Sequence, residues 1–118
     1  MSPVARHLEA AGIPTLVIGS ARDIVEECGV ARFLFSDFPL GNPCGVPFDR
    51  EMQARILGHG LDLLESARLP RTTVQAPEVW NPADEDWKLR YALVDDSNRE
   101  TLRRQGEARR AAQVAGGA

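Results

Sequence analysis

The chain has 118 residues, of which 43% are hydrophobic and 26% charged, a composition typical of one soluble globular domain. Its 14 basic and 17 acidic side chains give a net charge of −3, which argues against nucleic-acid binding driven by bulk charge. No apolar run approaches the ~20 residues of a membrane-spanning helix, and the first residues lack the apolar core of a signal peptide. We therefore expect a cytoplasmic protein that binds neither nucleic acid nor membranes.

The first third of the chain has the pattern of a βαβ unit. Residues 3–11 read as a helix that Gly12 ends, and residues 13–18 form an apolar, β-branched run typical of a strand buried in a parallel sheet. Residues 21–28 read as a second helix, and residues 31–35 as a second strand. A strand, a short helix and a strand in this order predict a right-handed crossover.

Residues 36–48 contain three prolines and two glycines, so they are neither a helix nor an interior strand. Four large apolar side chains in the segment predict that it is packed against the protein: Phe38, Leu40, Val46 and Phe48. Long ordered loops of this kind are often functional.

Asp49 can cap a long helix over residues 50–67. Gly58 and Gly60 each lower the stability of a helix by ~1 kcal/mol relative to alanine. A close approach of another backbone, which only glycine would allow, is the gain that we expect to offset this cost. The helix has an apolar stripe that we expect in the core: Met52, Ile56, Leu63, Leu64 and Ala67, widened by Leu57 and Leu61.

Residues 71–95 hold both tryptophans and the only tyrosine, and the alternation of Leu89, Tyr91 and Leu93 predicts a short strand. A polar, arginine-rich helix follows near residues 98–114. We divide the chain into an α/β half domain, 1–70, and a C-terminal extension, 71–118, interpreted as an arm that wraps a partner. Its expected partner contacts are Trp80, Trp87, Tyr91 and Arg103, although the aromatic residues are equally suited to a core and the helix to a solvated face.

The most specific motif is Phe38-Pro39-Leu40-Gly41-Asn42-Pro43. With the helix ending in Glu9-Ala10-Ala11-Gly12, the run Ile13-Pro14-Thr15-Leu16-Val17-Ile18 and the stretch Cys28-Gly29-Val30-Ala31-Arg32, it makes residues 3–67 similar to one family. The segment resembles the C-terminal part of the substrate-specific B subunit of glycine, sarcosine and betaine reductases, which are related to D-proline reductase. In that family a cysteine or selenocysteine, just before the helix equivalent to residues 3–11, attacks the substrate. Only Met1-Ser2 precede that helix here, so no family nucleophile carries over.

The resemblance implies a partial Rossmann-like α/β fold with flanking helices. A pair of strands is not stable by itself, so we expect a second polypeptide to complete the sheet, either a larger subunit with the cysteine or selenocysteine loop or a second copy in a homodimer. The implied function is that of a small subunit of an oxidoreductase that reductively cleaves a carbon–heteroatom bond in a small polar substrate. The alternative is a non-catalytic binding or assembly module of the same fold.

The candidate substrate-binding residues lie where parallel strands end. Ser20 and Arg22 open a helix and could hold an anion, although a simple helix cap is the plainer interpretation. Leu40, Gly41 and Asn42 belong to the loop that would line a shared active site, or to a rigid connection that covers the sheet.

If the chain is a self-contained homodimeric enzyme, Cys44 is its candidate nucleophile. The candidate is weak, because no lysine or histidine near it in sequence would lower its pKa. Cys28 fits the apolar side of a helix. We interpret His59 as a solvated surface residue opposite the core stripe. His7 and His59 have no second histidine or cysteine at helical spacing, so we expect no metal site, and we expect no cofactor.

Overall fold

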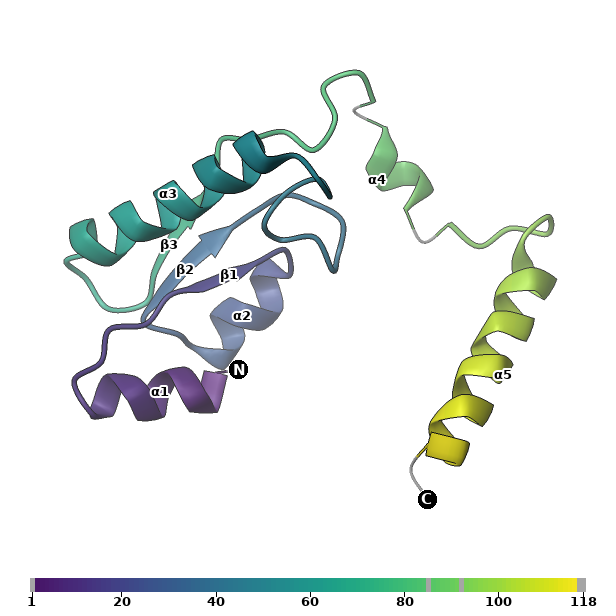
Figure 1. The fold of residues 1–118 in the computed structure, drawn as a ribbon, viewed down its shortest axis with the longest axis horizontal. Coiled ribbons are helices and arrows are strands. Elements are labelled where there is room, and N and C mark those ends of the chain that lie inside the picture. Colours follow the sequence, from purple (N-terminus) through teal and green to yellow (C-terminus); the bar gives the residue numbers. More distant parts are fainter. Residues whose placement is uncertain (1, 85, 92, 117–118) are drawn as a thin grey trace. The chain divides into compact units, whose positions relative to one another are not determined.

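The computed structural model describes residues 2–84, 86–91 and 93–116. The chain divides into two compact units, Met1–Glu85 and Asp86–Ala118. The first unit has three layers, with α1 and α2 on one face of a sheet and α3 on the other (Figure 1). Its helices are α1 (Ser2–Ala10), α2 (Arg22–Cys28) and α3 (Arg50–Ser66).

The sheet consists of the parallel strands β1 (Val17–Gly19), β2 (Arg32–Phe35) and β3 (Thr72–Gln75), in the order β1-β2-β3. Ile18 is in register with Leu34, and Leu34 with Val74. The predicted βαβ unit is confirmed, since α2 connects two parallel neighbours.

The third strand was not predicted, so the sheet of the α/β half has three strands rather than the pair that we expected. β3 has a single large apolar residue, Val74, and this side chain is 42% exposed, so the strand has no apolar run to reveal it. Because β3 pairs with β2, the division expected at residue 70 falls inside the first unit.

The strand predicted from Leu89, Tyr91 and Leu93 is also wrong. Residues Trp87–Arg90 form the short helix α4, which the Tyr91 N–H closes by donating to the Trp87 carbonyl at 2.8 Å. Position 92, inside that predicted strand, lies outside the described residues. The predicted final helix is present as α5 (Arg99–Gly116).

The predicted helix boundaries follow from local hydrogen bonding. Gly12 ends α1 with a φ of +81°, and the next N–H, that of Ile13, reaches back to the Leu8 carbonyl at 2.9 Å. Asp49 caps α3 by accepting the Met52 N–H at 2.9 Å.

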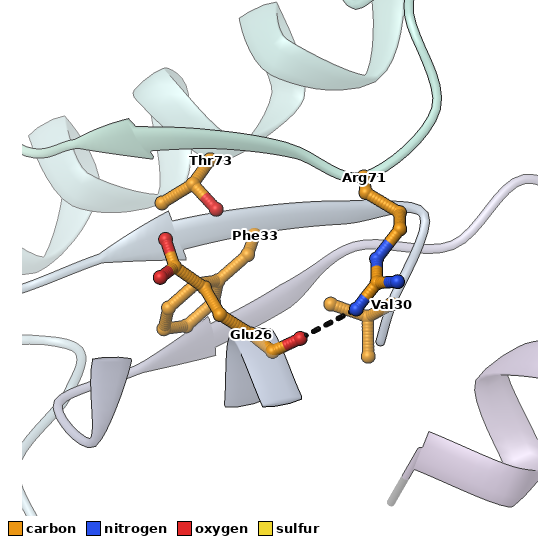
Figure 2. Close-up of a pocket in the computed structure, with 5 residues that line it drawn as sticks. All are labelled: Glu26, Val30, Phe33, Arg71 and Thr73. Atoms are coloured by element: carbon orange, nitrogen blue, oxygen red, sulfur yellow. Dashed lines mark hydrogen bonds between the residues drawn. The ribbon is translucent and has the colours of Figure 1, made fainter. Parts of the chain in front are cut away.

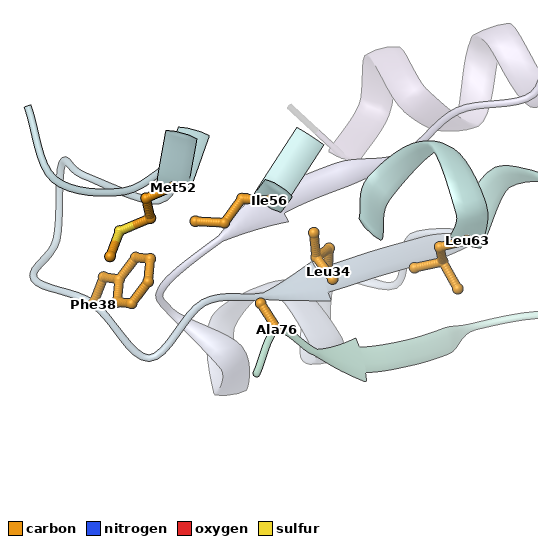
Figure 3. Close-up of a cluster of buried hydrophobic side chains, with 6 residues drawn as sticks. All are labelled: Leu34, Phe38, Met52, Ile56, Leu63 and Ala76. Carbon is orange, nitrogen blue, oxygen red and sulfur yellow. The ribbon is translucent and has the colours of Figure 1, made fainter. Parts of the chain in front are cut away.

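The core lies between α3 and the sheet (Figure 3) and consists of Leu34, Phe38, Met52, Ile56, Leu63 and Ala76. The expectation that Leu57 and Leu61 widen this core is wrong, because each is 55% exposed. They lie on a flank of α3 that is more exposed than the face packed on the sheet.

One of the two helix glycines is explained by close packing. A Cβ at Gly60 would lie 2.6 Å from Cδ2 of Leu16, a side chain directly before β1 rather than the backbone that we expected. A Cβ at Gly58 would meet no atom within 4 Å. Only Gly60 is therefore required by packing.

The two glycines provide a matched pair of variants. Gly58→Ala should raise the free energy of unfolding by ~1 kcal/mol through helix propensity alone. Gly60→Ala should be less stable than Gly58→Ala by ~1 kcal/mol or more, because overpacking offsets the same gain. Urea unfolding of both variants measures the difference, and equal stabilisation would show that Leu16 moves aside freely.

α1 is tied to the sheet by the carboxylate of Glu9. It accepts the backbone N–H and the hydroxyl of Thr15, the latter at 2.8 Å, and forms an ion pair with Arg32 at 2.9 Å. These hydrogen bonds from Thr15, and then the nearby Arg32, lower the pKa of Glu9 below its ordinary value. Folding therefore favours the ionised form of this side chain.

The lowered pKa of Glu9 gives a pH dependence with a definite sign. Its contribution to stability is fully present above the unfolded-state pKa of ~4.3 and is lost as the pH falls through the lower folded-state value. Glu9→Gln should thus destabilise the protein at pH 7, and the deficit should shrink in acid. Denaturant titrations across that range test this, with the exposed Glu27→Gln as a control that should show no such convergence.

Candidate functional site

The carboxyl ends of the three strands meet at one edge of the sheet, which also holds residues 36–48 and the start of α3. Strand pairing continues one residue further, since the Ser36 N–H donates to the Gly19 carbonyl at 2.9 Å and the Ala76 N–H to the Phe35 carbonyl at 2.8 Å. We call this region the carboxyl edge. Ligands of open α/β sheets bind at such edges.

Two serine hydroxyls lie at the ends of neighbouring strands, Ser20 after β1 and Ser36 after β2. Both oxygens are buried, and neither has a hydrogen-bond partner among the described residues. Ser36 is wholly inaccessible to solvent. Because side chains alternate along a strand, both hydroxyls follow Ile18 and Leu34 on the α3 face. Buried polar groups are normally paired, so two orphans side by side are unusual.

Ser20 was expected to cap α2, but it does not. The N-cap residue is Ala21, and among the described residues no side chain makes a capping hydrogen bond there. Arg22 does not join the hydroxyl either. Its guanidinium pairs with Glu26 at 3.0 Å and lies over the Phe35 ring on the α2 side of the sheet.

The loop after β2 is built from consecutive turns. The Asn42 N–H donates to the Pro39 carbonyl at 3.1 Å, and the Asn42 carbonyl accepts the Gly45 N–H at 3.2 Å. Gly41 adopts a φ of +93°, which favours glycine, and Leu40 is 59% exposed. These turns make the loop an ordered part of the carboxyl edge.

The prediction that this loop packs against the protein holds for only part of it. Phe38 is buried and lies 5.5 Å from the Trp80 ring, and Val46 packs against the core. Phe48, by contrast, is 98% exposed and has a φ of +67°, a conformation uncommon for a bulky side chain. Sequence reasoning placed this residue in the packed part, and only the structure identifies it as a surface feature.

Cys44 lies on the exposed side of the same loop and has no hydrogen-bond or ion-pair partner within the described part of the chain. No base is therefore paired with it there, as an activated cysteine requires. Cys28 is exposed as well, so its predicted place on a buried helix face is wrong.

The predicted partner contacts are divided between the two units. Trp80 packs on Phe38 and so belongs partly to the core of the first unit. In the second unit, the Trp87 and Tyr91 rings contact edge to face at 6.0 Å. Arg103 is held within α5 by Glu100 and Glu107, both at 2.8 Å.

His59 is not the solvated residue that we expected. Its Nε2 lies 3.0 Å from Oε1 of Glu78, a carboxylate that follows β3 and is 8% exposed. Arg55 adds its Nε at 3.6 Å from the same oxygen. The second oxygen of Glu78 is buried without a described partner. This cluster attaches the chain after β3 to α3.

Two shallow cavities of about 170 Å³ flank β3 on its two faces. One lies on the α2 side (Figure 2), where Glu26, Val30, Phe33, Arg71 and Thr73 line it and Nη2 of Arg71 donates to the Glu26 carbonyl at 2.8 Å. The other lies between α3 and β3 and includes His59, Asp62 and Ser66. Polar groups thus border β3 above and below.

The orphaned hydroxyl of Ser36 predicts an unusual change in stability. Ser36→Ala removes an unsatisfied buried group and should raise the free energy of unfolding by ~1 kcal/mol. Thr72→Val is the control, because its hydroxyl donates to the Leu69 carbonyl at 2.6 Å and its loss should be destabilising. Denaturant unfolding separates the two signs, and a loss of stability in Ser36→Ala would show that the hydroxyl is satisfied.

The described residues contain no group of three or more histidine, cysteine, aspartate or glutamate side chains arranged to hold a metal ion. Among the same residues, no helix has the length and apolar character needed to cross a membrane. Comparisons of the chain with protein-family models, with curated proteins and with solved structures gave no match. The resemblance given by the sequence motifs stays a prediction.

Proposed function

We propose that this chain is the small subunit of an enzyme complex in which the carboxyl edge forms one wall of an active site and another polypeptide supplies the reacting group. The observation that carries the proposal is the pair of buried, unpartnered hydroxyls of Ser20 and Ser36 at the ends of neighbouring strands. Each unsatisfied group costs stability, and natural proteins keep such groups mainly at functional sites.

The chemistry of the pair indicates the class of ligand. A hydroxyl donates one hydrogen bond, so two adjacent hydroxyls match the two oxygens of a carboxylate or a carbonyl beside another acceptor. Both hydroxyl oxygens are buried in the isolated chain, and Ser36 is itself the first residue of loop 36–48. A ligand therefore reaches them when this loop is rearranged, and docking of the partner would provide that rearrangement.

Phe48 supplies the contact that the partner would use. A non-glycine residue in this conformation costs ~1 kcal/mol or more, and its fully exposed aromatic ring gains nothing in the isolated chain. Large aromatic side chains dominate the energetics of protein interfaces. A partner pocket that receives the ring would account for both the strain and the exposure.

The reaction class comes from the family resemblance. By that resemblance the partner carries a cysteine or selenocysteine, and the complex reductively cleaves a carbon–heteroatom bond in a small polar substrate. The second candidate function is a non-catalytic binding or assembly module, which the unpaired Cys44 favours, because no other thiol lies in the loop.

The test uses the tagged full chain expressed in its native host. The wild type should retain a polypeptide with a reactive cysteine or selenocysteine, and Phe48→Gly should lose it by at least ~10-fold, as expected for an interface hot spot. Phe48→Gly should remain folded, because glycine accepts this backbone conformation. Leu69→Ala, which alters another exposed apolar residue, is the control and should retain the partner.

Binding to the purified complex then tests the ligand site. Glycine, sarcosine and betaine are the probes, and Ser36→Ala should weaken calorimetric binding by ~10-fold, the loss of one hydrogen bond to a charged group. If the tagged chain retains no polypeptide with a reactive cysteine or selenocysteine, the proposal is overturned in favour of the assembly module. Loss of activity in Cys44→Ala would instead indicate a self-contained enzyme.

A further inference from the structure

Helix α3 carries two apolar faces, of which one is buried and the other is exposed apart from the half-buried Leu64. The packed face consists of Met52, Ile56, Gly60 and Leu63. The other consists of Ala54, Leu57, Leu61 and Leu64, at spacings of three, four and three residues, which keep side chains on one side of a helix. Leu57 and Leu61 are each 55% exposed. We call this second face the outer stripe.

The outer stripe lies on the β1 side of the sheet. Gly60, which borders the stripe, packs on Leu16 and Ile18 at β1. On the opposite flank of the helix, His59 contacts Glu78 after β3. The two flanks of α3 therefore overhang the two edges of the sheet, and the apolar one overhangs β1.

The edge of β1 is open to a further strand. Gly19 directs its carbonyl toward β2, so alternation along the strand directs the N–H and carbonyl of Ile18 away from β2, where no described residue pairs with them. Below this edge, Ile24 of α2 is 62% exposed. Glu26 lines the cavity beside β3 with Arg71 and Thr73, and Ile24, two residues away, lies on the opposite side of the helix. Apolar side chains thus border β1 in both layers, whereas polar groups border β3.

We propose that a second copy of this chain docks on the β1 edge about a two-fold axis, with β1 antiparallel to β1 and α3 antiparallel to α3. Two copies of the three-stranded sheet would then form one continuous sheet. The proposal does not rest on the proposed function.

The outer stripe is complementary to itself in this arrangement. An antiparallel pair centred between Leu57 and Leu61 places Leu57 against Leu61 of the second copy, and the small Ala54 against the larger Leu64. The four residues of the stripe are uncharged, so the axis brings no like charges together among them, and the charged Arg50 lies one turn before Ala54 at the end of the helix. The same axis passes near Ile18, because a Cβ at Gly60, which borders the stripe halfway along it, would lie 3.5 Å from Cδ1 of Ile18.

The spacing of the two layers also agrees. Gly60 packs on side chains of both β1 and β2, so α3 sits above the space between these strands. Adding a neighbour to β1 at the usual strand spacing of ~4.8 Å places the two α3 helices ~10 Å apart, which is a normal distance for packed helices. The two carboxyl edges then lie at opposite ends of the joint sheet, so each stays accessible.

Sedimentation equilibrium of the full chain tests the assembly. The wild type should have twice the monomer mass of 12.9 kDa. Leu57→Glu/Leu61→Glu should be monomeric with an unchanged helix signal, because the substitutions place four carboxylates at the axis. Leu69→Glu, which alters an exposed leucine outside the stripe, should remain dimeric.

Disulfide formation tests the antiparallel register independently of folding defects. In a Cys28→Ser/Cys44→Ser background, a mixture of Leu57→Cys and Leu61→Cys chains should form a crosslinked dimer at least ~10-fold faster than either variant alone, because only unlike positions face each other at disulfide distance. A monomeric wild type, a dimer that survives the double glutamate substitution, or faster crosslinking of either variant alone would each overturn the proposal.

Discussion

The architecture of the first unit depends on the central strand β2, which is the only described strand with a neighbour on both sides. Phe33 and Leu34, adjacent along this strand, are 1% and 0% exposed and point to opposite faces. Phe33 supports the α2 layer and Leu34 the α3 layer. The four residues of β2 therefore hold both edge strands and both helical layers in place. The surfaces that remain exposed are those furthest from this strand.

Much of the fold could be predicted because its signals are local. Gly12 and Gly29 end helices with backbone conformations that glycine favours, and Asp49 caps α3 through its own side chain. β3 could not be predicted in the same way. Its pairing with β2 is set by contacts remote in sequence, and its residues carry neither an apolar run nor a clear alternation. The misassigned Leu57 shows the same limit, since an apolar residue on a helix does not reveal whether anything covers it.

The candidate site could be predicted in position but not in detail. A loop rich in proline and glycine after a buried strand indicated the carboxyl edge, and Ser20 was identified from its place before a helix. A single serine after a strand is common, so the sequence does not single out Ser36, and only its burial without a described partner distinguishes it. Phe48 shows the opposite limit of the sequence. A phenylalanine normally indicates a core, and its exposure follows from a backbone conformation that no sequence pattern indicated.

The position of β3 also bears on how the chain folds as it is synthesised. Ala76 belongs to the core, and Trp80 packs on Phe38, which lies more than forty residues earlier. A nascent chain that ends before these residues leaves Leu34 and Phe38 without part of their cover, although β1, β2 and α3 are already complete. The core of the first unit is therefore completed late in synthesis. Its last residues come from the segment after residue 70, which the sequence alone assigned to an external arm.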